Sequence, residues 1–148
     1  MIREATLSPR EIAEELRPAI LRLARQLRRE TEALGVTSQQ VTLLWLVRTH
    51  PGLSLRELAS EEGISAPSLS GHVDRLEALG LLRRVRSTED RRRVGLELTT
   101  EGQSLLKRVR ARRTTWLAER LALLPDDERG RLEGALPTLY ALLEQEPR

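Results

Sequence analysis

Three consecutive arginines follow an aspartate near the middle of the chain, at Asp90-Arg91-Arg92-Arg93. Guanidinium groups stay charged at neutral pH and bind phosphate oxygens through paired hydrogen bonds. A narrow minor groove of DNA concentrates negative potential, and an arginine inserted there reads that shape. Asp90 stands two residues before Arg92, where its carboxylate can orient that guanidinium. An ordinary polar loop would not need three adjacent arginines, so the segment predicts contact with DNA.

A second group of residues with DNA-binding chemistry lies on a helix expected over residues 65–79. Leu69, Val73 and Leu76 recur at helical spacing, so small and polar residues occupy the opposite face. Small side chains permit close approach, and serine, histidine and arginine can donate to base edges or phosphates. The residues predicted to bind DNA from this helix are Ser65, Pro67, Ser68, Ser70, Gly71, His72 and Arg75. Those predicted to bind it from the segment that follows are Arg86, Asp90, Arg91, Arg92 and Arg93.

The elements that must hold these residues are marked by cap and turn residues. Ser54 is expected to cap a short helix, Gly63 to take a left-handed turn with Ile64 at the corner, and Ser65 to cap the second helix. Two short helices joined by a glycine turn form a helix-turn-helix. Its inward residues are predicted to be Leu55, Leu58, Ala59, Leu69, Val73, Leu76 and Leu79.

The segment after the helix-turn-helix alternates with period two on both sides of Ser87–Arg93, which predicts a β-hairpin over residues 83–98. A helix-turn-helix followed by a hairpin with a basic tip is a winged helix. Its second helix is expected in the major groove and the hairpin, or wing, in the minor groove. The fold class expected is therefore mainly α with a small β-hairpin wing.

Longer helices are expected on both sides of this unit. Ser8-Pro9-Arg10-Glu11 starts the first, in which Pro18 predicts a kink or a break. Thr37 starts a second helix, and a capping box at Thr100 starts a long one through about Leu124. The last helix begins after Pro125 and should be kinked by Pro137. The residues expected on one face of the second helix are Val41, Leu44, Trp45 and Val47.

Charge is unevenly distributed in this chain of 148 residues, whose net charge is only +3. Residues 81–93 carry six arginines against two acids, and residues 107–124 carry six basic residues against one acid. Such local patches attract phosphate backbones. Two alternatives remain open at this point: the 107–124 segment can be a solvated face paired with acids elsewhere, and Arg75 can pair with Asp74 or Glu77.

Several classes of site are excluded or disfavoured by composition. Without cysteine the chain cannot form disulfides, thiolate zinc sites or iron–sulfur clusters. His50 and His72 lie on different helices without metal-ligand spacing or a nearby nucleophile, so no catalytic residue, metal or cofactor is predicted. No apolar run approaches 18 residues and no leader is recognised, so a cytoplasmic protein without membrane contact is expected.

Three blocks in this order resemble the MarR (multiple antibiotic resistance regulator) family of winged-helix transcription factors: residues 52–59, residues 73–84 and residues 90–102, with Asp90-x-Arg92 as the hallmark. The likeness covers about residues 8–145. It implies a homodimer on a pseudo-palindromic double-stranded DNA operator, in most cases repressing transcription. It also implies release by a small phenolic or aromatic effector, whose identity and pocket residues the sequence does not give.

A homodimer is also expected because the terminal helices carry apolar stripes outside the winged-helix core. The predicted interface residues are Ile12, Leu16, Leu117, Leu121, Leu136, Leu139 and Leu143. The expected organisation is a dimerisation helix over residues 1–35, a DNA-binding lobe over 36–100 and dimerisation helices over 101–148. The alternative function is a winged helix that docks proteins without sequence-specific DNA binding.

Overall fold

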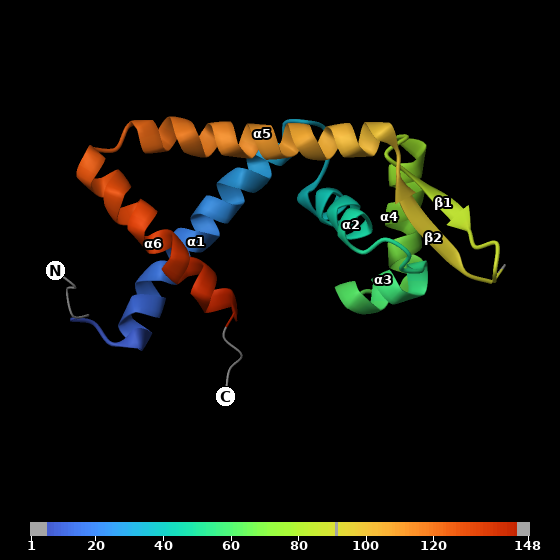
Figure 1. The fold of residues 1–148 in the computed structure, drawn as a ribbon, viewed down its shortest axis with the longest axis horizontal. Coiled ribbons are helices and arrows are strands. Elements are labelled where there is room, and N and C mark those ends of the chain that lie inside the picture. Colours follow the sequence, from blue (N-terminus) through green and yellow to red (C-terminus); the bar gives the residue numbers. More distant parts are fainter. Residues whose placement is uncertain (1–5, 91, 145–148) are drawn as a thin grey trace. The chain divides into compact units, whose positions relative to one another are not determined.

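A computed structural model describes residues 6–90 and 92–144 of the chain. It is mainly helical, with one antiparallel pair of strands, as the sequence predicts. The elements are α1 (Pro9–Glu32), α2 (Ser38–Thr49), α3 (Leu55–Glu62), α4 (Ala66–Ala78), β1 (Leu82–Arg86), β2 (Val94–Leu98), α5 (Thr100–Ala122) and α6 (Asp126–Glu144) (Figure 1). The chain divides into two compact units, one ending at Arg113 and the other beginning at Thr114.

Helices α1, α2 and α3 begin with the same device. Each has a serine or threonine N-cap whose hydroxyl accepts from the backbone three residues later, and a glutamate or glutamine there that accepts in return. The three predicted starts at Ser8, Thr37 and Ser54 are thus confirmed. At the first of them, hydrogen bonds from the Ser8 hydroxyl and the Ser8 amide lower the pKa of the Glu11 carboxyl.

The turn between α3 and α4 is the sharp corner of the helix-turn-helix. Gly63 caps α3 in the left-handed region, with φ of 62°, which a residue with a Cβ adopts only at a cost. Ile64 follows and packs against the core, and Ser65 then caps α4 by accepting from the Ser68 amide. The helix-turn-helix is confirmed residue by residue at this corner.

The wing is a hairpin in which Leu82 pairs with Leu98, Arg84 with Leu96 and Arg86 with Val94. Leu82 and Leu96 are buried, so this face of the hairpin lies on the core. The other edge of β2 is met by an isolated bridge between Ser54 and Gly95. The predicted hairpin is confirmed, and with the helix-turn-helix it completes a winged helix.

The core of the first unit gathers residues from α2, α3, α4, the hairpin and the first turns of α5. Its most buried members, with at most 1% of their surface exposed, are Leu44, Leu58, Leu69, Val73, Leu76 and Leu82. Helix α5 adds Leu105, Leu106 and Val109. Because α4 is held by three of its own residues, its opposite face is fixed toward the exterior.

The start of α5 depends on a close backbone approach. Gly102 is buried, and a Cβ built on it would overlap the carbonyl oxygen of Leu81 and lie 3.4 Å from a methyl of Leu98. Thr99 caps this helix, since its hydroxyl accepts from the Gly102 amide at 3.1 Å. The predicted cap at Thr100 is therefore wrong by one residue.

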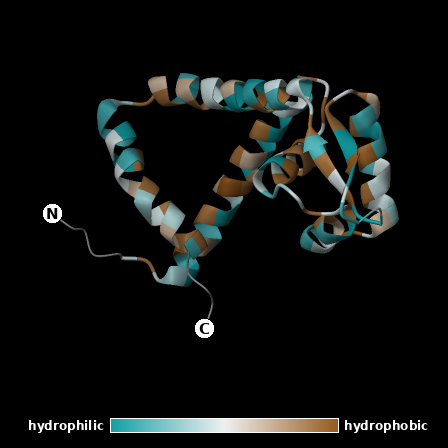
Figure 2. Ribbon diagram, turned by 45° about the vertical axis from the view of Figure 1, so that its right-hand side comes forward, coloured by the Kyte–Doolittle hydropathy of each residue, from teal (hydrophilic) through white to brown (hydrophobic). Residues whose placement is uncertain are grey.

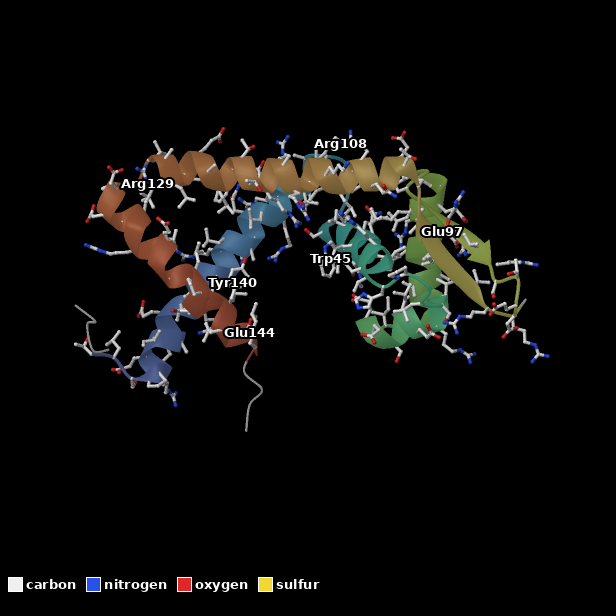
Figure 3. All side chains as sticks on the ribbon, viewed as in Figure 1. Trp45, Glu97, Arg108, Arg129, Tyr140 and Glu144 are labelled. Atoms are coloured by element: carbon white, nitrogen blue, oxygen red, sulfur yellow. The ribbon has the colours of Figure 1, made fainter. Side chains whose placement is uncertain are left out.

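Two apolar residues expected in the core are exposed. Trp45 is 50% exposed, because Leu43 is buried with Leu44 and turns the apolar side of α2 away from it. Figure 3 shows Trp45 projecting from α2 on the side away from the hairpin. Leu79 is 56% exposed, because it caps α4 after the last helical turn, and Leu81 enters the core in its place.

Both internal prolines are accommodated within helices. Helix α1 continues through Pro18, so the break that was one of two expectations there does not occur, and α6 continues through Pro137. No helix in residues 6–90 and 92–144 combines the length and the apolarity needed to cross a bilayer.

Candidate nucleic-acid interface

The outward face of α4 carries the residues that the sequence assigns to it. Pro67, Ser68 and Arg75 are exposed, and Gly71 and His72 are half-buried between them. At the N-cap of α4, the Ser65 hydroxyl accepts from the Ser68 amide at 3.3 Å and donates to the Ser68 hydroxyl at 2.9 Å. Ser65 thus serves the cap, while Ser68 keeps its own hydroxyl proton for an outside acceptor.

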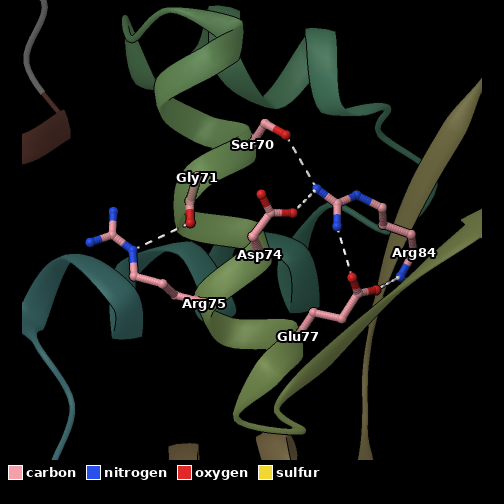
Figure 4. Close-up of polar contacts among 6 residues, drawn as sticks. All are labelled: Ser70, Gly71, Asp74, Arg75, Glu77 and Arg84. Atoms are coloured by element: carbon pink, nitrogen blue, oxygen red, sulfur yellow. Dashed lines mark hydrogen bonds and ion pairs between the residues drawn. The ribbon is translucent and has the colours of Figure 1, made fainter.

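Arg75 is oriented along the outward face rather than toward the acids of α4. Its Nε donates to the Gly71 carbonyl at 3.3 Å, and a terminal nitrogen lies 3.4 Å from Nδ1 of His72. Asp74 and Glu77 are engaged by Arg84, on the opposite side of the helix (Figure 4). The alternative in which Arg75 pairs with those acids is therefore not what the structure shows.

Arg84 joins β1 to α4 through a network of polar contacts. Its guanidinium donates to Asp74 at 2.7 Å, to Glu77 at 2.8 Å and to the Ser70 hydroxyl at 3.2 Å. The hydrogen bond to Asp74, followed by its charge and the contact with Glu77, raises the pKa of Arg84 against the opposing effect of burial. Ser70, predicted to bind DNA, has its oxygen turned to the wing.

The tip of the wing is ordered by Asp90, although not in the expected way. Its carboxylate accepts from the backbone amide of Arg92 at 3.0 Å, and the Asp90 amide donates to the Ser87 hydroxyl at 3.2 Å. The expectation that Asp90 orients the Arg92 guanidinium is therefore wrong. Short acidic side chains favour this local turn, because they reach the backbone two residues on. Arg91 lies outside the described residues.

The arginines of the wing divide into paired and unpaired groups. Arg83 pairs with Glu97 at 2.7 Å across the hairpin, and Arg93 pairs with Glu57 of α3 at 2.9 Å. Arg86 and Arg92 are exposed and form no ion pair within the described part of the wing. These two are accordingly the described wing arginines whose charge is available to phosphate.

Some basic residues of the 107–124 segment are engaged by contacts within their own unit. In the first unit Arg112 pairs with Glu30 at 3.0 Å, and Arg113 donates to the Thr31 hydroxyl at 2.9 Å. Burial lowers the pKa of Arg113. Lys107, Arg108 and Arg110 of the same helix are exposed as well, and Arg108 is labelled in Figure 3. In the second unit the Arg120 guanidinium stacks 4.1 Å from the centre of the Trp116 ring.

The sequence did not identify the residues that connect the wing to the helices. Two of them, Ser70 and Arg93, were predicted instead to bind DNA. Period two offered a signal for one of them, because it places Arg84 on the same face as Leu82 and Leu96. That inward face meets acids spaced by one helical turn on α4, at Asp74 and Glu77. No comparable signal exists for Glu57, whose partner Arg93 is 36 residues away.

The chain is similar to known regulators along most of its length. A model of the MarR family matches residues 36–94. The HTH-type transcriptional regulator Mb0904 of Mycobacterium bovis is 31% identical over 140 residues, which cover 95% of this chain and 98% of that protein. The HTH-type transcriptional repressor MdtR of Bacillus subtilis is 33% identical over 97 residues, 66% of this chain and 63% of that protein.

Solved structures share the fold of this chain. A variant of MepR from S. aureus, bound to an oligodeoxyribonucleotide, has a TM-score of 0.72 at 21% identity, and the match covers 88% of this chain and 96% of that one. The resemblance seen in the sequence is thus confirmed by full-length similarity and by the fold. The chain belongs to the MarR family of helix-turn-helix transcriptional regulators and is not an enzyme.

Proposed function

We propose that this regulator binds a pseudo-palindromic operator as a homodimer, with α4 in the major groove and the wing in the minor groove, and that it represses transcription. The observation that carries the proposal is the outward face of α4, where Ser68, His72 and Arg75 lie clear of the core beside a wing that exposes Arg86 and Arg92. MepR, of the same fold, is bound to DNA, and MdtR is named a repressor.

The proposed dimer is supported by helices whose apolar residues remain largely exposed within the chain. Helix α6 is 19 residues long and none of them is buried. Figure 2 shows hydrophobic segments recurring along α1 and along α6. Helix α1 also bears a shallow apolar groove of about 270 Å³, lined by Ala13, Leu16, Arg17, Ile20 and Leu21. Apolar faces of this kind mark interaction sites.

The residues proposed for the interface are all at least partly exposed. Ile12 is 41%, Leu136 47% and Leu143 83% exposed, and Leu16, Leu117, Leu121 and Leu139 are half-buried. Residues 1–35 and 101–148 would then supply the dimer contacts and residues 36–100 the DNA contacts. Twofold symmetry would place the two α4 helices about 34–36 Å apart, the distance between half-sites one helical turn apart.

Selection of bound duplexes from a random library by the purified protein tests this proposal. The expected product is a palindrome whose half-sites are separated by about one turn of DNA. Recovery of no enriched sequence would favour the alternative of a protein-docking winged helix. Because operator binding takes place on the chromosome, we place this function in the cytoplasm. We also propose that a small phenolic or aromatic effector, of the kind the family resemblance implies, releases the protein from DNA.

Replacing Arg92 by alanine is expected to weaken DNA binding and also to make it less sensitive to salt. Each phosphate contact contributes about −0.9 to the slope of log affinity against log salt concentration, because bound counterions are released. Losing one contact per wing should therefore make the slope of the dimer less steep by about two units. Fluorescence anisotropy with a labelled duplex between low and moderate salt measures both quantities.

Arg10, on the first turn of α1, provides a control of equal charge for this experiment. Its side chain is 89% exposed and pairs with Glu14 in the next turn. Arg10→Ala should leave the slope unchanged. An Arg92→Ala protein with the affinity and slope of the parent would show that the wing tip does not touch DNA.

A further inference from the structure

The wing is fastened to the helix-turn-helix at two places, one on each strand side. On the β1 side, the Arg84 side chain is 28% exposed and reaches two carboxylates and a hydroxyl of α4. In addition, the Arg84 backbone amide donates to Glu77 at 3.1 Å. These contacts hold both the side chain and the main chain of β1 against α4.

On the β2 side, Arg93 forms the second connection. Its guanidinium donates to the Gly52 carbonyl at 2.9 Å and pairs with the Glu57 carboxylate at 2.9 Å. Glu57 is also the third residue of α3, where it accepts from the Ser54 amide at 3.1 Å. The start of α3, the turn before it and the tip end of β2 are thereby held at one point.

We propose that Arg84 and Arg93 are positioning residues that fix the angle of the wing on α4, rather than contacts to DNA. The inference rests on the proposed binding of DNA and assigns a different role to two of the wing's arginines. Each guanidinium already faces carboxylates, so its charge is neutralised within the chain. Each arginine contributes to binding indirectly: it raises the fraction of molecules in which the wing is positioned to enter the minor groove.

The positioning role and the phosphate-contact role predict opposite effects of removing the acids. If Arg93 touched phosphate, neutralising Glu57 would release the arginine and remove a repulsive charge, so affinity would rise. If Arg93 positions the wing, the same change frees the wing and affinity falls. Glutamine is the suitable replacement, because it satisfies the capping position as glutamate does. Asp74→Asn separates the two roles of Arg84 in the same way.

The decisive variants are Glu57→Gln and Arg93→Gln, compared with Glu61→Gln. Glu61 is an exposed glutamate of the same helix with no ion pair in residues 6–90 and 92–144. Affinity and its salt slope are measured by anisotropy on the selected palindrome and on a random duplex of about 30 base pairs, long enough for both half-sites. Apparent affinity scales with the competent fraction, so a threefold loss at each wing lowers dimer affinity about tenfold.

We expect Glu57→Gln and Arg93→Gln to lose about tenfold in affinity for the palindrome with the slope of the parent, and Glu61→Gln to match or exceed the parent. A rise in affinity for Glu57→Gln, or a slope less steep by one unit or more for Arg93→Gln, would overturn the assignment. Arg84→Gln and Asp74→Asn repeat the test on the other strand. Circular dichroism establishes that each variant is folded at the assay temperature.

The outcomes also separate this inference from the proposed function. If the parent protein binds neither duplex in a salt-dependent manner, the proposed DNA binding fails. In that case the anchoring of the wing can still be tested without DNA, by measuring the hydrogen-exchange rates of the β1 and β2 backbone amides. Arg93→Gln and Glu57→Gln should speed that exchange, whereas Glu61→Gln should not, and unchanged exchange in all three contradicts the anchor.

Discussion

Replacing Gly102 by alanine is expected to destabilise the protein by about 2–3 kcal/mol, although the residue lies within a helix. Alanine in a helix interior is normally preferred to glycine by about 1 kcal/mol, because glycine loses more backbone entropy on folding. Here the added methyl group would overlap the Leu81 carbonyl oxygen and press on Leu98. Backbone atoms cannot move aside as a flexible side chain can, so α5 would have to shift from the hairpin.

Gly130 offers the matched control, since it lies inside α6 where an added methyl group would meet no described atom within 4 Å beyond its own helical turn. Gly130→Ala should stabilise the protein by about 0.5–1 kcal/mol, the opposite sign from Gly102→Ala. Urea unfolding followed by circular dichroism gives both values. Equal effects of the two substitutions would contradict the close approach at the start of α5.

Replacing Leu136 by glutamate is expected to convert the proposed dimer into a folded monomer and to reduce operator affinity by about 100-fold or more. Leu136 is 47% exposed within the chain, so a charge there costs little in the isolated subunit. In a symmetric interface the substitution appears twice and buries two carboxylates without partners, at several kcal/mol each. A monomer also loses the second half-site, and with it the gain of about 10²–10⁴ that linked binding confers.

The measurement is the molar mass by light scattering at micromolar concentration, combined with anisotropy on the selected palindrome. Arg131→Glu is the control on the same helix, because its side chain is 78% exposed and pairs with Asp127 one turn earlier. It should leave the mass unchanged. A Leu136→Glu protein that stays dimeric with full affinity would show that this stripe of α6 lies outside the interface.

The parts of the fold that sequence reasoning reached are those fixed by local chemistry. Caps such as Ser54 and Ser65, and the left-handed turn at Gly63, are decided by a few neighbouring residues. Period two located the hairpin because one of its faces is buried. The errors at Trp45 and Leu79 arose where spacing alone fits two arrangements. Leu43 and Leu81 take the buried positions instead, a choice that depends on packing between elements.

The candidate site was predictable to a different degree in its two halves. The outward residues of α4 follow from the helical period once Leu69, Val73 and Leu76 are placed in the core. The state of the wing arginines does not follow, because their partners are distant in the sequence. Arg93 finds Glu57 across 36 positions and Arg84 finds Asp74 across 10. A count of arginines therefore overstates the charge that the wing presents to DNA.

The hydrogen bond from the Arg84 amide to Glu77 has a consequence for how copies of the chain can meet. The exposed edge of a sheet offers unpaired amides that recruit strands from other molecules, and such additions lead to aggregation. In β1 the middle amide of that edge is occupied by a carboxylate, and the far edge of β2 is met by Ser54. A strand that added to either edge of the hairpin would have to displace the Glu77 carboxylate from β1 or Ser54 from β2.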